Sequence, residues 1–172
     1  MSYWGNDVNS KTLCIATVFL LTATLALASG PPPMKEGLWL LNRQTIDNPG
    51  NKKEVWPPIR ICRDHAYDQY VLDLAKKVPG CTTVSESMRG DTYLVDLKCT
   101  IGKTTLDTKS TTIIQDDIAA HGESHTTYTP AMDGKTETIM FSDAKYLGSC
   151  PAGMQPGDRM DANGSIIHRK QH

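Results

Sequence analysis

The sequence predicts a mainly β fold, an antiparallel curved sheet or partly closed barrel with one packed α-helix and two disulfides. Three observations predict it. Fourteen threonines lie between Thr82 and Thr138, and a β-branched side chain suits a pleated, half-solvated surface. Between residues 37 and 141, short strand-like segments alternate with turns that contain glycine, proline and aspartate. One segment after residue 28 has apolar residues at helical spacing.

The N-terminal segment differs from the rest of the chain. Residues 13–28 form an apolar run without a charge, preceded by Lys11 and ending in Ala26-Leu27-Ala28. Small residues at positions 26 and 28 are those that a signal peptidase recognises, so we expect residues 1–28 to be a cleavable signal peptide. The run is shorter than the roughly 20 residues that span a bilayer. We therefore expect a periplasmic protein with no membrane span after cleavage; an uncleaved N-terminal anchor is the alternative.

The composition of the remaining chain predicts a thin core. The whole chain is 39% apolar, and without residues 1–28 the fraction falls to about 35%. We expect one β-rich domain over residues 29–156 and a mobile tail over residues 157–172, because the chain after Cys150 is rich in proline, glycine and charged residues. The formal net charge of −1 excludes a generally basic nucleic-acid-binding protein.

The first elements of the domain are two strands and the helix. Residues 37–46 predict a strand that ends at the turn Asp47-Asn48-Pro49-Gly50, and residues 55–61 predict the next. Pro57-Pro58 confines that part of the second strand to an edge or a bulge. Asp64 can cap a helix that Pro79-Gly80 ends. Its apolar residues at helical spacing are Tyr67, Tyr70, Val71, Leu74 and Val78.

Strands joined by turns follow from Cys81 onward. A turn centred on Gly90 joins two strand-like runs, the second of which alternates over residues 93–101. Residues 103–114 and 118–129 predict the next hairpin. Asp133-Gly134 is a two-residue hairpin signal that leads into a strand over residues 136–141.

Four cysteines remain after the signal, since Cys14 leaves with it, and an oxidising compartment allows them three pairings. Cys81 and Cys99 are each nine residues from Gly90, so a hairpin centred there places them directly opposite each other. That pairing leaves Cys62 with Cys150. The chain has no C-x-x-C pair, and the cysteine spacing matches no zinc module.

One cluster of residues could bind a metal. His121, Glu123 and His125 alternate along a predicted strand, which places all three on one face. Two imidazoles and a carboxylate are suitable ligands for zinc or copper. The competing interpretation is a solvated polar face.

No sequence motif predicts catalysis. The chain has no nucleophile-elbow pattern and no glycine loop that would cradle a phosphate, and its cysteines are expected to be paired. We therefore expect a non-enzymatic module without a cofactor that binds a small apolar ligand or an envelope partner. A zinc- or copper-binding protein that uses His121, Glu123 and His125 is the main alternative. A hydrolase whose residues meet only in three dimensions is a third.

The motifs together resemble a bacterial envelope family, domain of unknown function 3617. They cover roughly residues 34–158: E-G-L-W at 36–39, I-C-R-D at 61–64, P-G-C at 79–81, Cys99, and L-G-S-C-P-A-G-M at 147–154 running on to P-G-D at 156–158. The last block is the most distinctive. The resemblance implies an exported, disulfide-bearing, β-rich domain with no assigned activity and no catalytic residues.

Overall fold

The computed structural model describes residues 30–161 and 163–170, so the predicted signal peptide lies outside the described residues. The strands in these ranges are β1 (Gly37–Asn48), β2 (Lys52–Arg63), β3 (Cys81–Arg89), β4 (Thr92–Ile101), β5 (Thr104–Gln115), β6 (Ala119–Met132), β7 (Lys135–Gly148), β8 (Arg159–Met160) and β9 (Ile166–Ile167). They form one antiparallel sheet in the order β3-β4-β5-β6-β7-β1-β2-β8-β9.

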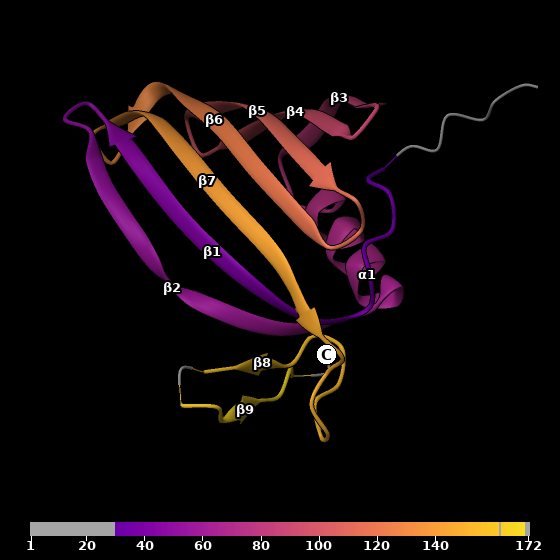
Figure 1. Cartoon of the computed structure of the whole chain (residues 1–172). Coiled ribbons are helices and arrows are strands. Elements are labelled where there is room, and N and C mark those ends of the chain that lie inside the picture. Colours follow the sequence, from indigo (N-terminus) through magenta and orange to yellow (C-terminus); the bar gives the residue numbers. More distant parts are fainter. Residues whose placement is uncertain (1–29, 162, 171–172) are drawn as a thin grey trace, which may run out of the picture.

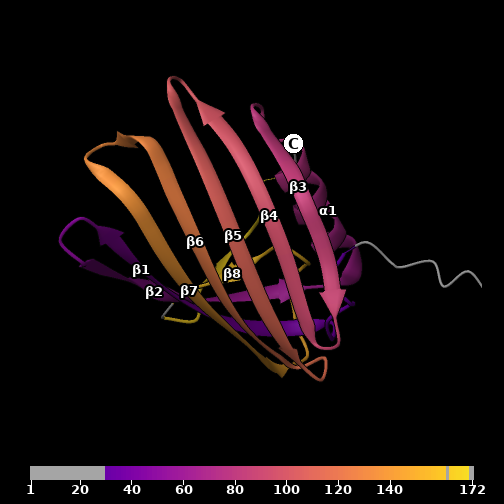
Figure 2. The same cartoon turned by 90° about the horizontal axis from the view of Figure 1, so that it is seen from above.

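The sheet is strongly curved and open (Figures 1 and 2). In the described residues, β3 ends the strand order on one side and β9 on the other, so the sheet does not close into a barrel. The one helix of the described residues, α1 (His65–Lys76), lies at the open side next to β3. The predicted curved antiparallel sheet with one helix is confirmed.

Local chemistry sets the bounds of α1 and the irregularity of β2. The Asp64 side chain accepts a hydrogen bond from the Tyr67 N–H at 2.6 Å, which is the predicted N-cap. In β2, Ile59 pairs with Leu41, whereas Trp56 pairs with Arg43. The register therefore shifts by one residue at Pro57-Pro58, which is a bulge, one of the two positions, edge or bulge, that the prolines predict.

A thin core lies on the concave face of the sheet, which we define as the face turned toward α1 and residues 31–34. Its buried cluster is Met34, Trp39, Ile61 and Ile114. Trp39 is 0% exposed, and its Nε1 donates to the Lys35 carbonyl at 2.8 Å. It also packs edge-on against the Tyr146 ring, with centroids 5.8 Å apart.

The two predicted disulfides, Cys62–Cys150 and Cys81–Cys99, are both present. In the register of β3 and β4, Cys81 is the direct partner of Cys99, so the predicted pairing is confirmed. The hairpin is centred between Gly90 and Asp91 rather than on Gly90, since Arg89 pairs with Thr92. A bulge between Thr83 and Ser85 shifts the register by one residue and brings Cys81 opposite Cys99.

One strand is longer than its sequence pattern predicts. We expected a strand over residues 136–141, but β7 continues to Gly148. Asp143 and Lys145 point to the convex face, while Ala144 and Tyr146 pack against the core on the concave face. The continuation is half-buried, and its polar residues are on the solvent side.

The segment predicted to be a mobile tail, residues 157–172, contains β8 and β9 in its described part. Residues of β8 pair with Arg60 and Ile61 of β2, and the Cys62 N–H donates to the Asp158 carbonyl at 3.0 Å. Asp158 itself is 3% exposed. The mobility of this segment stays a prediction.

Candidate functional site

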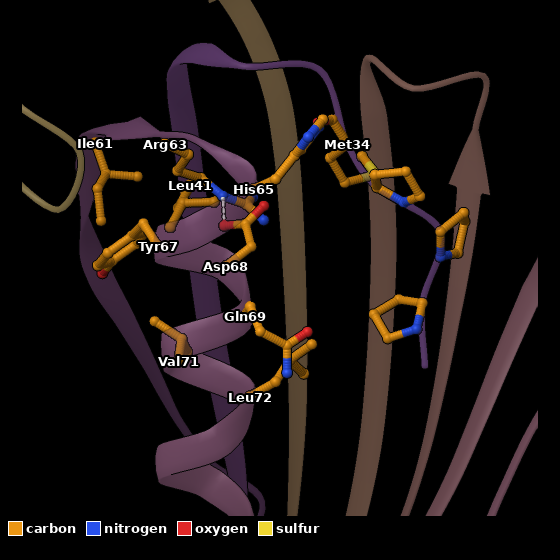
Figure 3. Close-up of a pocket in the computed structure, with 13 residues that line it drawn as sticks. Met34, Leu41, Ile61, Arg63, His65, Tyr67, Asp68, Gln69, Val71 and Leu72 are labelled. Atoms are coloured by element: carbon orange, nitrogen blue, oxygen red, sulfur yellow. Dashed lines mark hydrogen bonds and ion pairs between the residues drawn. The ribbon is translucent and has the colours of Figure 1, made fainter. Parts of the chain in front are cut away.

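A groove on the concave face is the candidate site. It consists of two adjoining cavities of about 430 and 470 Å³. Both are lined by Pro31, Met34, Leu41 and Arg63, and we call them together the concave groove. The helix cavity lies between α1 and the strands β1 and β2 (Figure 3), and the sheet cavity lies over the middle of the sheet.

The floor of the sheet cavity is made of small and apolar side chains from β5, β6 and β7. They are Thr112, Ile114, Ala120, Gly122, Met140, Ser142 and Ala144. A Cβ added at Gly122 would lie 2.6 Å from the Ser142 Oγ, so only glycine fits that position without a shift. Short side chains on three neighbouring strands therefore leave the floor low, and the space above it open.

The helix forms the opposite wall. Tyr67, Val71 and Leu72 face the helix cavity, and no residue of α1 is buried. Val71 is 43% exposed, although it lies on the inner side of the helix. The wall also contains the polar residues His65, Asp68 and Gln69. Its apolar side chains are not covered by the sheet, which is the property of a binding surface rather than of a packed core.

Ion pairs and hydrogen bonds hold this wall in place. Arg63 Nε donates to Asp68 Oδ1 at 2.8 Å, and its guanidinium lies over the Trp39 ring at 5.2 Å. Near the other end of α1, Lys76 Nζ lies 3.6 Å from Glu86 Oε2 on β3.

Tyr93 of β4 lines the sheet cavity as a neutral hydroxyl. It donates to Glu86 Oε1 at 2.5 Å. Burial, together with the hydrogen bond and the charge of Glu86, raises the pKa of Tyr93 far above its ordinary value of 10.0. The groove therefore gains no negative charge from this residue at physiological pH.

The proposed metal ligands lie on the convex face, away from the groove. As predicted, β6 places His121, Glu123 and His125 on one face, where they line a shallow hollow of about 330 Å³. His121 Nδ1 lies 2.7 Å from Asp143 Oδ1, and His125 Nε2 lies 2.6 Å from Glu123 Oε1. No group of three or more histidine, cysteine or acidic side chains that could hold a metal is found among residues 30–161 and 163–170. The metal-binding alternative is therefore not favoured.

The pKa of His125 is nevertheless shifted by its neighbours. The hydrogen bond with Glu123 raises the pKa of His125 above its ordinary value of 6.5, and Glu137, with Oε1 3.5 Å from Nδ1, adds to the effect. Desolvation opposes the shift. An exposed histidine between two carboxylates is a solvated polar face, which was the competing interpretation of these residues.

The groove residues themselves were not singled out from the sequence. The signal that could have found them is the small size of the inward positions on adjacent strands, such as Thr112 on β5, Gly122 on β6 and Ser142 on β7. These positions are direct partners across the sheet, but their alignment depends on a register that the pattern alone did not give.

The comparisons with known proteins agree with this architecture. The family model described as "Protein of unknown function (DUF3617)" matches residues 34–150, which include every strand from β1 to β7 and all four disulfide cysteines. Among curated proteins, no sequence matches the chain. Two disulfides indicate an oxidising, exported environment. In the part of the chain that the structure describes, no helix is long and apolar enough to cross a membrane.

Proposed function

Because the chain belongs to the DUF3617 family of proteins of unknown function, we propose its function from the concave groove: the protein binds the alkyl chain of a small amphiphile there. In this proposal it is a non-enzymatic binding module of the periplasm. The exported setting is supported by the two disulfides and by the signal-like residues 1–28.

The observation that carries the proposal is an apolar cavity of ligand size between two layers of the fold. Small-molecule sites have volumes of about 300–1,000 Å³ and mainly apolar walls, and each half of the groove is within that range at about 430 and 470 Å³. The helix cavity has Ile61, Tyr67 and Val71 in its walls, and the sheet cavity has Ile114 and Met140. An alkyl chain that displaces water from these surfaces gains free energy in proportion to the area it buries.

A chain-length series tests the proposal. Octanol, decanol and dodecanol compete with the neutral fluorophore N-phenyl-1-naphthylamine for the purified protein with residues 1–28 removed. Each pair of added methylenes contributes about 1.6 kcal/mol if it is fully buried, which is about 15-fold in Kd. A Kd that does not change with chain length would refute a buried alkyl chain.

Two substitutions on β5 localise the site. Thr112→Trp fills the sheet cavity from its floor, and Thr111→Trp places the same side chain on the exposed convex face of the same strand. We expect Thr112→Trp to raise the Kd for dodecanol by about tenfold or more, because the indole takes the space of the chain. Thr111→Trp is the matched control and is expected to bind as the wild type does. Equal Kd values for the two variants, both with a wild-type melting temperature, would place binding outside the groove.

A further inference from the structure

We propose that the groove selects an anionic ligand, a single alkyl chain that ends in a carboxylate, and that Arg43 binds this headgroup. The inference rests on the proposed function and adds the chemical class of the ligand. The charges that line the groove support it.

The charged residues at the two cavities are Arg43, Arg63, His65, Asp68 and Asp143, although the Asp143 carboxylate points to the convex face. All but the first have a partner within the fold. Asp68 accepts from Arg63 at 2.8 Å, and Asp143 lies 2.7 Å from the imidazole of His121.

His65, the third of these, has two partners. Its Nε2 lies 3.0 Å from the Met34 carbonyl, and its Nδ1 lies 3.4 Å from Glu36. Among the described residues, Arg43 makes no side-chain hydrogen bond or ion pair with any of its neighbours. The groove therefore has one uncompensated charge, a guanidinium.

The position of Arg43 fits a headgroup site. It is half-buried on β1, where its direct partners are Ser142 on β7 and Trp56 on β2. It lines the sheet cavity but not the helix cavity, and the shared residues Met34 and Leu41 connect the two. A ligand whose head lies at Arg43 therefore has a continuous apolar path for its chain toward α1.

Arg63, the other arginine of the groove, is committed to the protein. Its Nε is bound to Asp68, and its guanidinium is stacked on the Trp39 ring. It closes the wall near the start of the helix and leaves the recognition of an anion to Arg43.

A carboxylate matches this site better than a phosphate does. The planar guanidinium fork pairs with a carboxylate through two parallel hydrogen bonds. One arginine neutralises the single charge of a carboxylate, whereas a phosphate monoester carries about −1.5 to −2 and would leave excess charge in an apolar groove. Cavities of about 430 and 470 Å³ in series provide an elongated path suited to one chain.

The test compares dodecanoate with dodecanol by isothermal titration calorimetry, at about pH 8, where the carboxylate is ionised. The quantity measured is the ratio of the Kd for dodecanol to the Kd for dodecanoate. In Arg43→Gln we expect this ratio to fall by about tenfold or more, with the dodecanol Kd unchanged, since a hydrogen bond to a charged group is lost. Arg89→Gln, which removes the same charge from an exposed position at the end of β3, is the matched control and leaves the ratio as it is in the wild type.

Each outcome separates the headgroup from the groove. A ratio that Arg43→Gln does not change, while the alcohols still bind with their chain-length dependence, overturns the role of Arg43 and leaves the proposed function standing. Failure of both dodecanoate and the alcohols to bind overturns both. Dodecyl phosphate binding more tightly than dodecanoate, with the same loss in Arg43→Gln, overturns the choice of a carboxylate.

Discussion

Asp158 attaches the C-terminal segment to the sheet, and replacing it by asparagine tests how much this attachment contributes to stability. Its side chain is almost fully buried and accepts three hydrogen bonds. Oδ2 accepts from the Gln155 N–H at 2.8 Å and from His168 Nδ1 at 2.9 Å, and Oδ1 accepts from the Arg169 N–H at 2.8 Å. The backbone at Gly157 and Asp158 adds bonds to Cys62 of β2 at 2.8 and 3.0 Å.

The cost follows from the number of acceptors. An amide has one oxygen and one NH₂ group, so Asp158→Asn leaves one backbone N–H, that of Gln155 or that of Arg169, facing a donor. The remaining bonds lose their charge as well. Bonds to a charged group contribute about 1.5–3 kcal/mol each, so we expect the free energy of unfolding at neutral pH to fall by about 3 kcal/mol.

The stabilisation by the Asp158 carboxylate depends on pH. The backbone N–H of Gln155, then that of Arg169 and the His168 side chain hold the pKa of Asp158 below its ordinary value of 3.8, against desolvation. Since the folded pKa is lowered, the stabilisation is present above pH 3.8 and is lost as the pH falls through the folded value. The difference between wild type and Asp158→Asn should therefore shrink in acid.

Urea denaturation at neutral pH and in acid measures both effects, and amide exchange over residues 159–169 reports the local attachment. Asp107→Asn is the matched control, because Asp107 is exposed and its ion pair with Lys98 spans 3.6 Å, so we expect a loss of less than about 1 kcal/mol. If Asp158→Asn were as stable as Asp107→Asn, or if its deficit persisted undiminished in acid, the reasoning about the buried carboxylate would be refuted.

Two further predictions concern the disulfides and the convex histidines. The two disulfides close loops with sequence separations of 18 and 88. In urea denaturation, we expect the free energy of unfolding to fall by about 3 kcal/mol when Cys81 and Cys99 are both replaced by alanine, and by about 4.6 kcal/mol when Cys62 and Cys150 are. The reverse order would contradict the loop-entropy account. Glu123→Gln should lower the pKa of His125 in an NMR titration, because it removes the carboxylate that contributes most to raising it. Since the folded pKa is raised, the Glu123–His125 pair stabilises the fold fully below pH 6.5 and loses this effect as the pH rises through the folded pKa. An unchanged His125 titration in Glu123→Gln would show that another group causes the shift.

Most of the strands and the Cys81–Cys99 disulfide could be predicted, because they depend on residues close together in the sequence, and Cys62–Cys150 followed as the remaining pair. The turn signal at Gly90 locates the centre of the hairpin to within one residue, and a bulge between Thr83 and Ser85 that the pattern did not predict supplies the remaining shift at Cys81. The capping by Asp64 and the bulge at Pro57-Pro58 are likewise properties of a few neighbouring residues. Such features need no knowledge of the sheet order.

The groove could not be predicted in the same way, because its walls come from segments far apart in the sequence. Arg43 meets Ser142 only because β1 pairs with β7 on one side and β2 on the other. The continuation of β7 beyond Phe141 was missed for a related reason: a strand that alternates between a half-filled groove and solvent gives a weak apolar signal. Periodicity shows which residues share a face but not what lies across from that face.

The position of α1 explains how an open groove and a stable fold coexist. No residue of the helix is buried, so packing alone fixes it weakly. Its two ends are instead close to disulfide cysteines. Before the helix, Cys62 is joined to Cys150 in the segment after β7, and after the helix, Cys81 is joined to Cys99 on β4. Covalent links near both ends hold the helix away from the sheet, so side chains do not have to fill the space between them. A thin core and two disulfides are thus consistent with one requirement, that the concave face remain available to a ligand.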